Sequence, residues 1–372
     1  MRTSKYFSDK IILIFAVCVV LSFLCQIFKF TAPVNILYVI TLLLVLGCYL
    51  LSGHFNVITL AITVLVCFAA IVNGFRAKEM DYYTHILITI CIFMCIGVSS
   101  YVQISSLTFI KIVHLFFVTT VILLLAYYFG PLKSSYFSFT DVICLNFPNP
   151  NAAGLWLTCF FVLLLYSASL FRSYKRAMYT IAALALLPII IATQSRNSFL
   201  ACLFFIAGLI VSKIFHIKRV PNWCWAVMAT LPLIVFAFYM FVIVENMDFW
   251  EKFFSLDAID KGLGTRVSVW QNVIDNFAEC FFFGDYYRFF NSQPHNSLLT
   301  IFLRFGAPAT VFSCITIYQS LKRLQAKSSF YAAFSLSAIL FTGCFEASVF
   351  VGIAGMYLML LLIPACASVE KA

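Results

Sequence analysis

The sequence predicts an all-α polytopic membrane protein, and two properties of its 372 residues support this fold class. Hydrophobic residues make up 63% of the chain and charged residues only 10%, and the mean hydropathy is +1.03. Soluble domains do not have this composition. Apolar runs of about 18 to 22 residues recur along the whole length, and each can cross a hydrocarbon core of about 30 Å. We therefore expect residues 1–372 to form a single integral membrane domain.

About twelve transmembrane helices are expected, one for each apolar run. In chain order they cover residues 11–28, 35–52, 57–74, 86–104, 112–130, 154–171, 177–194, 197–212, 224–244, 296–319, 330–346 and 350–368. The first run follows a basic segment, as in a signal peptide, but the chain continues CQIFKFTAPVN without a small-residue cleavage site. We expect it to be retained as the first helix.

The distribution of basic residues predicts the orientation, because Lys and Arg accumulate in cytoplasmic loops. With the N-terminus inside, the cytoplasmic segments contain only two acids, Asp9 and Glu370. The bases in these segments are Arg2, Lys5, Lys10, Lys111, Arg172, Lys175, Arg176, Lys213, Lys218, Arg219, Lys322, Arg323, Lys327 and Lys371. An odd number of spans would destroy this segregation, so we expect both termini to be cytoplasmic. This topology also accounts for the net charge of +10, and no nucleic-acid partner is expected.

Two long loops are predicted on the outer side, and loops of unusual length often carry function. The first, residues 131–153, ends in a turn-forming run from Pro148 to Asn151, before a helix expected from Gly154. The second, residues 247–294, lies between spans nine and ten and is the largest polar segment of the chain.

The second loop contains the pattern of an amphipathic helix at the membrane surface. Thr265 is a plausible N-cap. The apolar residues that follow it at helical spacing are Val267, Trp270, Ile274, Phe277 and Phe281. Arg266 would lie in the first helical turn, where a cation opposes the helix dipole and so needs another reason to be there. The alternative is a surface helix that only anchors the loop.

Two further arginines lie where a charge is costly. Arg196 follows span seven on the outer side, against the positive-inside tendency, and Arg304 lies within span ten. Ionisable residues at such positions are functional candidates by default. For Arg196 the alternative is a side chain that extends to the lipid headgroups.

His295 stands between Pro294 and Asn296 at the start of span ten. The proline interrupts the chain there, which places an imidazole at the outer mouth of a membrane helix. Imidazoles ordinarily titrate near pH 6.5, as a general base at neutral pH requires. An interfacial histidine without a catalytic role is the alternative. Cys144 and Cys280 both lie in outer loops, so a disulfide between them is also left open.

Four segments in this order resemble the bacterial O-antigen polymerase and O-antigen ligase superfamily, membrane glycosyltransferases that act on glycans carried by undecaprenyl diphosphate. They are FPNPNAAG at 147–154, TQSRNSFL at 193–200, GTRVSVW at 264–270 with Gly284 downstream, and PHNSLLTIFLRFG at 294–306. The resemblance covers residues 147–310, and the first 146 residues match only in hydropathy.

The resemblance implies an O-antigen polymerase at the periplasmic face of the bacterial inner membrane, which joins undecaprenyl-diphosphate-linked oligosaccharide repeats. One alternative is a ligase that transfers the finished glycan to lipid A core. A polysaccharide transporter or flippase is an alternative from a different class. The expected partners are the lipid-linked glycans, a chain-length regulator, a flippase and membrane lipids.

The transfer chemistry assigns roles to the candidate residues. The departing diphosphate needs positive charge, which the guanidinium groups of Arg196 and Arg266 can supply without a metal. His295 would take the proton of the attacking hydroxyl, and Asn296 would orient the imidazole or the sugar. The other expected substrate-binding residues are Trp270, Arg288, Arg304 and Asn149. No Asp-x-Asp pair occurs on an outer loop, so we expect neither a metal nor another cofactor.

Overall fold

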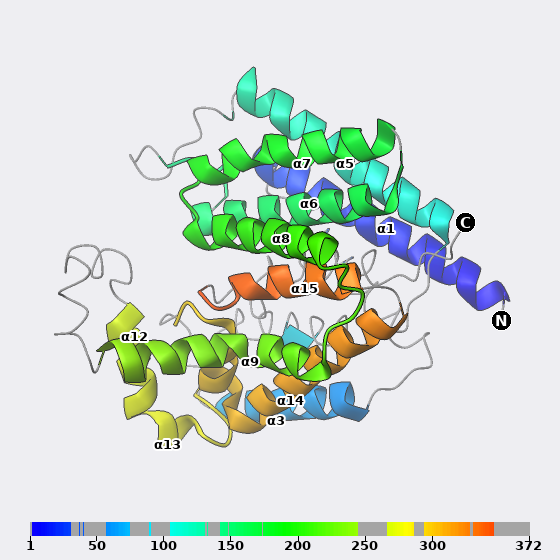
Figure 1. The fold of residues 1–372 in the computed structure, drawn as a ribbon. Helices are drawn as coiled ribbons and strands as arrows, with labels where there is room; N and C mark the ends of the chain where they lie inside the picture. The colour runs from blue at the N-terminus through cyan, green and yellow to red at the C-terminus, as the bar shows by residue number, and fades with distance from the viewer. Residues whose placement is uncertain are drawn as a thin grey trace.

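The computed structural model describes most of the chain as a bundle of helices (Figure 1). The described residues are 2–30, 57–74, 105–130, 142–147, 149–172, 174–244, 266–285, 294–327 and 330–345, together with positions 37, 40, 89, 90 and 132. The predicted spans 35–52 and 86–104 lie almost wholly outside these residues, and the predicted span 350–368 lies entirely outside them. The predicted all-helical class is confirmed for the described part of the chain.

The described helices follow the apolar runs in order. They are α1 (Arg2–Ile27), α3 (Val57–Gly74), α5 (Ser106–Tyr128), α6 (Pro150–Leu170), α7 (Tyr174–Ala192), α8 (Arg196–Ile214), α9 (Asn222–Phe238), the π-helix η2 (Tyr239–Val244), α12 (Arg266–Asp275), α13 (Phe277–Cys280), α14 (Ser297–Lys327) and α15 (Phe330–Thr342). Seven helices among the described residues are long and apolar enough to cross a membrane, namely α1, α5, α6, α7, α8, α9 with the start of η2, and α14. The chain is therefore a multi-pass membrane protein, and the total of twelve spans stays a prediction.

Side-chain caps set two helix starts that hydropathy placed too late. The α5 helix begins six residues before the predicted 112 because Ser105 caps it, accepting a hydrogen bond from the Thr108 N–H at 3.3 Å. The Ser105 N–H in turn donates to the Asp9 carboxylate at 2.9 Å. This bond joins the start of α5 to α1.

The centre of the bundle is α6, which is buried on nearly all sides. It contacts α5, α7, α8 and α15. Aromatic side chains fill its interface with α1, where the Phe23 ring lies 5.0 Å from Trp156 and 4.8 Å from Phe160 between centroids. A helix that is apolar all round belongs in the interior of a bundle, and α6 therefore forms the support on which the neighbouring helices align.

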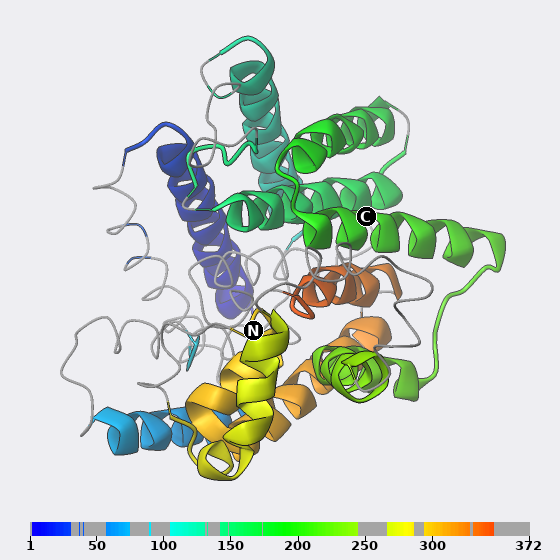
Figure 2. The ribbon, with the colours of Figure 1, turned by 90° about the vertical axis from the view of Figure 1, so that its left-hand side faces the viewer.

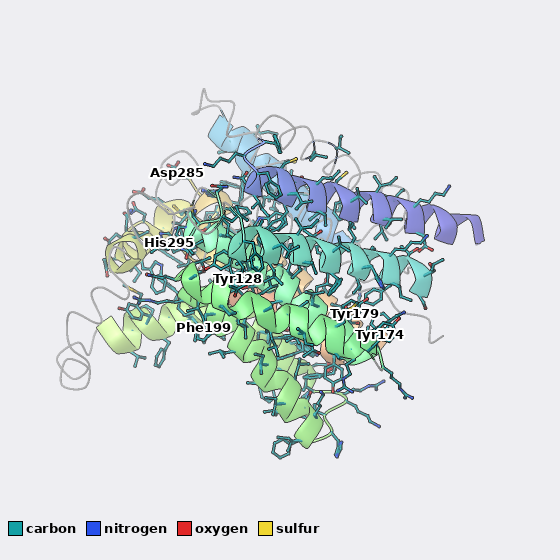
Figure 3. The ribbon with its side chains drawn as sticks, turned by 90° about the horizontal axis from the view of Figure 1, so that it is seen from above. Tyr128, Tyr174, Tyr179, Phe199, Asp285 and His295 are labelled. Atoms are coloured by element: carbon teal, nitrogen blue, oxygen red, sulfur yellow. The ribbon has the colours of Figure 1, made fainter. Side chains whose placement is uncertain are left out.

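From α5 to α9 successive helices run in alternating directions, so their ends lie at two opposite ends of the bundle (Figure 1). We call the end at which α7 stops and α8 begins the site end. Figure 3 shows His295 and Asp285 at this end, and Tyr174 and Tyr179 of α7 toward the other end. The loop containing Arg172, which the charge pattern predicts to be cytoplasmic, thus lies far from His295.

Candidate functional site

Arg196 is the first residue of α8 and is exposed at the site end. The chain reaches it through Gln194, whose φ of 50° lies in the left-handed region that residues other than glycine seldom adopt. Asn197 follows and is buried, with 9% of its surface exposed. The local fold therefore exposes the guanidinium-bearing residue and anchors its neighbour in the protein.

The start of α6 packs directly against the start of α8. A Cβ atom added to Gly154 would lie 2.5 Å from the Ser195 Cβ and 2.7 Å from the Ser198 Oγ. The Thr158 hydroxyl also contacts the Ser198 carbonyl at 3.3 Å. The segments FPNPNAAG and TQSRNSFL are therefore in contact through Gly154, Ser195 and Ser198.

Asn149 is the N-cap of α6 and is exposed. Its Oδ1 accepts a hydrogen bond from the Ala152 N–H at 2.7 Å, and Pro150 occupies the first helical position, where a missing N–H costs nothing. The expected start of the helix at Gly154 is therefore four residues too late, because the Pro-Asn run begins the helix instead of preceding it. Asn149 stays a predicted substrate-binding residue.

Asn296 is the buried N-cap of α14, with 0% of its surface exposed. Its Oδ1 accepts from the Leu299 N–H at 3.1 Å, and its Nδ2 donates to the carbonyls of Pro232 at 2.7 Å and Cys344 at 3.2 Å. These bonds join α14 to α9 and to the turn after α15. In this structure the Asn296 amide thus orients helices, and its contact with a sugar stays a prediction.

His295 directly precedes this cap and is partly exposed. Its φ is 47°, again in the left-handed region. Residues held in such conformations cluster at ligand-binding and catalytic sites, where the surrounding structure fixes them. The buried cap on one side and Pro294 on the other fix the backbone of His295.

Trp270 connects the predicted outer loop to the residue before His295. The indole is fully buried, and its Nε1 donates to the Pro294 carbonyl at 2.6 Å. Phe236 and Tyr239 pack edge-on against it, with ring centroids 5.6 and 5.4 Å away. Trp270 therefore holds α12 against the start of α14.

Arg266 is the first residue of α12, one turn before Trp270. At 1.5 Å per residue, its Cα lies about 6 Å from that of Trp270 along the helix axis. The backbone thus brings Arg266 to the same end of the bundle as His295. The Arg266 side chain, the predicted cap Thr265 and the predicted ligand Arg288 lie outside the described part of the chain.

The predicted amphipathic helix of the outer loop is two short helices, not one. The Asn276 side chain donates to the Asn272 carbonyl at 2.7 Å and ends α12, as side-chain bonds to the backbone tend to do. Trp270 and Val273 face the protein, whereas Phe277 and Phe281, expected on the same face, are 50% and 38% exposed. The segment is thus divided into two short helices at Asn276, and the position of its apolar side chains at the membrane surface stays a prediction.

The chain after α13 bonds to α14 at a break in that helix. Figure 2 shows α12 and α13, in yellow, beside the orange α14. At Gly306 the backbone leaves the helix with φ 84° and ψ 176°. The Leu303 carbonyl accepts from the Asp285 N–H at 2.7 Å, and the Ala307 N–H donates to the Phe281 carbonyl at 2.7 Å. In an unbroken helix this carbonyl and this N–H would bond each other. The loop therefore satisfies both groups that the break leaves open.

Two glycines make this insertion sterically feasible. Gly284 has φ 67°, and a Cβ there would lie 2.5 Å from the Phe305 nitrogen. A Cβ on Gly306 would run into the Phe282 carbonyl. The sequence did not predict this contact or the role of Asp285, because the pair Phe-Gly at 283–284 and 305–306 also occurs at 129–130 and so does not mark the insertion.

Arg304 lies just before the break and is buried, with 3% of its surface exposed. The first half of α14 ends there, so the guanidinium is close to a helix C-terminus, where positive charge is favourable. The arginine expected within span ten thus occupies a buried position at the site end, and its role in substrate binding stays a prediction.

Cys144 and Cys280 are both free and buried, so the disulfide left open by the sequence is absent from the structure. Cys280 lies in α13, where it packs in one cluster with Trp270, Val273 and Phe302. Cys144 lies before α6, next to Leu145 and Asn146. The two residues belong to different parts of the site end.

We predict that Gly306→Ala strongly reduces the amount of folded protein. The conformation at this position is almost exclusive to glycine and costs other residues about 1 to 3 kcal/mol, and the added methyl group also meets the Phe282 carbonyl. Thermal unfolding of the purified protein in detergent measures the effect. Val311→Ala, five residues later at an exposed position of α14, is the control. Equal midpoints for the two variants would contradict the insertion.

Residues 181–284 match the family model described as O-antigen ligase. The matched region runs from α7 through α13 and contains Arg196, Arg266 and Trp270. It confirms the resemblance to the O-antigen ligase and polymerase superfamily that the sequence motifs predicted. Searches of curated proteins and of solved structures gave no significant match. The match to this family model supports a glycan-transfer activity of the ligase or polymerase type at a membrane.

Proposed function

We propose that this protein is an O-antigen polymerase that joins undecaprenyl-diphosphate-linked oligosaccharide repeats at the periplasmic face of the bacterial inner membrane. The convergence of the four motif segments at one end of the bundle is the observation that carries the proposal. Gly154 meets Ser195, Trp270 binds the Pro294 carbonyl, and Gly284 packs on the backbone of Arg304. Segments spread over 160 residues thus form one candidate site.

The electrostatics of the site end suit a diphosphate. Four helices, α6, α8, α12 and α14, begin among the converging segments, and helix N-termini present partial positive charge and N–H groups to anions. Arg196 and Arg266 are the first residues of two of these helices. Their cationic side chains oppose the helix dipoles, which is explained if a substrate anion binds between them.

The reaction follows from these groups. A hydroxyl of the incoming lipid-linked repeat attacks the anomeric carbon of the growing glycan, and His295 accepts the hydroxyl proton. The bond between that carbon and the diphosphate oxygen breaks, and undecaprenyl diphosphate leaves with the bonding electron pair. Arg196 and Arg266 stabilise the charge that develops on the departing diphosphate.

The exposed aromatic residues of the outer loop support a position at the lipid surface. Phe282 is 63% exposed and Phe277 50%. The Phe283 ring lies 5.3 Å from Phe68 of α3. Exposed Phe side chains on a surface segment can insert at the boundary between headgroups and acyl chains, and a lipid-linked substrate would present its sugar at this level. Membrane lipids are therefore proposed partners, along with a chain-length regulator and a flippase that supplies the repeats.

A ligase that transfers the glycan to lipid A core is the second candidate, and the description of the matched family favours it. The chemistry at the anomeric carbon is the same, and only the acceptor differs. A transporter or flippase is less well supported, because the candidate polar residues gather at one end of the bundle, whereas transporter sites lie near the bilayer midplane.

The glycan profile of a gene deletion distinguishes a polymerase from a ligase. A polymerase deletion should leave a single repeat attached to lipid A core, because ligation still proceeds. Long glycans that remain on the carrier lipid would instead identify a ligase. Purified protein with lipid-linked repeats should form polymer in the presence of a chelator, and loss of product on chelation would refute the proposed metal independence.

We predict that the site end faces the periplasm and the loop with Arg172 faces the cytoplasm, with both termini inside. The positive-inside distribution is the physical reason, and the alternating helices place the two regions at opposite ends. Reporter fusions at positions 173 and 260 measure this. A cytoplasmic signal from position 260 would overturn both the topology and the proposed reaction, because the substrate is presented on the other side.

A further inference from the structure

We propose that the turn Gly343–Phe345, directly after α15, is a positioning element that holds the start of α8 and the start of α14 in register. The inference rests on the proposed function, because Arg196 begins one of these helices and His295 precedes the other. None of the four motif segments includes this turn. It lies almost fifty residues after His295 and almost one hundred and fifty after Asn197.

The turn presents three consecutive carbonyl groups to its neighbours. Its N–H groups bond back to the last turn of α15, from Gly343 to Leu340 at 2.9 Å, from Cys344 to Phe341 at 3.1 Å and from Phe345 to Thr342 at 3.2 Å. The carbonyls at a helix C-terminus have no partner within the helix. They are therefore available to groups on other helices.

Donors from both helix starts use these three carbonyls. The Gly343 carbonyl accepts from the Ser297 N–H at 2.8 Å and from its hydroxyl at 2.7 Å. The Cys344 carbonyl accepts from the Asn296 Nδ2 at 3.2 Å. The Phe345 carbonyl accepts from the Asn197 Nδ2 at 3.1 Å. One backbone stretch thus holds α14 by two residues and α8 by one.

Because the donor groups are buried, losing any of these hydrogen bonds would be costly in free energy. Asn296 and Ser297 are fully buried and Asn197 is 9% exposed. Losing a bond in such surroundings leaves an unsatisfied polar group, which costs more than the bond itself contributes. Successive Cα atoms are about 3.8 Å apart, so the two helix starts are fixed within a few ångströms of the same three residues. This spacing sets the separation of the Arg196 and His295 backbones.

Gly343 allows the close approach of Ser297. A Cβ atom on Gly343 would collide with the Ser297 hydroxyl, while its next contact, the Leu340 carbonyl, would be 3.0 Å away. Gly343→Ala should therefore push the start of α14 away from the turn. Ser297→Ala removes the colliding atom and retains the Ser297 N–H bond, so it should relieve the displacement.

The test compares Gly343→Ala, Ser297→Ala and the double variant in lipid nanodiscs with purified lipid-linked repeats. At equal amounts of folded protein, Gly343→Ala should lower kcat at least about tenfold and change KM less than about threefold, because small displacements of reacting groups are costly. The double variant should return to the kcat of Ser297→Ala. Unchanged kcat in Gly343→Ala, or no recovery in the double variant, would overturn the inference.

Amide hydrogen exchange gives a readout that does not depend on catalysis. Gly343→Ala should increase exchange in both 194–200 and 294–300, and Ser297→Ala should reverse the increase. An increase confined to 294–300 would contradict the coupling. Coupled exchange together with normal turnover of His295→Ala would support the positioning role of the turn and would refute the proposed base, so the two failures are distinguishable.

Discussion

Replacement of His295 by Ala is expected to lower the turnover of lipid-linked repeats by about 10²- to 10⁴-fold, the usual share of general-base catalysis. His295 lies partly exposed just before the start of α14. Membrane insertion should be unchanged, because an interfacial side chain contributes little to the stability of a span. The measurement is product formed per folded protein.

The left-handed backbone at His295 calls for matched variants, because Ala is strained there in its own right. His295→Asn retains a residue that tolerates this conformation and removes the base, so it should lose as much activity as His295→Ala. His216 has φ 49° and is exposed in the loop between α8 and α9, so His216→Ala has the same backbone strain at the opposite end of the bundle. It should leave turnover unchanged.

A histidine with a purely structural role would behave differently. Its replacement would lower the amount of folded protein and the activity together, and the ratio of product to protein would stay close to that of the wild type. If either His295 variant retains more than about a third of wild-type turnover per folded protein, the general-base assignment is wrong. Even the low end of the expected catalytic share is far larger than threefold.

Hydropathy was sufficient to predict the described spanning helices because a bilayer imposes a minimum apolar length on each. The helices α7 and α8 begin within three residues and one residue of the predicted starts. Where the boundaries were wrong, a side chain decided them. Ser105 and Asn149 cap α5 and α6 and extend these helices beyond their apolar runs, which a hydropathy window does not detect.

The internal construction of the site was less accessible to sequence reasoning. The break in α14 depends on the close contact between Gly306 and the backbone of Phe282. Neither residue type indicates that the other lies beside it in the fold. Likewise, the sequence suggested a substrate role for Asn296, but its three bonds to the backbone depend on where the middle of α9 and the turn after α15 lie in the fold. Residue types indicated the chemistry, but contacts between distant segments determine which residues position it.

Conversion of Arg196 or Arg266 to Lys is expected to reduce glycan product by more than about tenfold, although the positive charge is kept. A guanidinium binds two phosphate oxygens with a planar pair of N–H groups, whereas an ammonium is a point charge. Removing one partner of a desolvated charge pair typically costs about 2 to 5 kcal/mol. The Lys variants keep the charge and lose only the two-point contact, so their loss should be smaller than that but still measurable.

Arg176 provides the matched control for this experiment. Like Arg196 it lies exposed in the first turn of a spanning helix, but α7 begins at the opposite end of the bundle. Arg176→Lys should therefore leave the glycan profile unchanged at equal protein levels. Headgroup contact alone would predict the same mild effect for Arg176→Lys and Arg196→Lys, because lysine reaches lipid phosphates as arginine does. Normal glycan profiles from both Arg196→Lys and Arg266→Lys would thus remove these residues from the diphosphate site, while a selective loss would separate substrate binding from membrane anchoring.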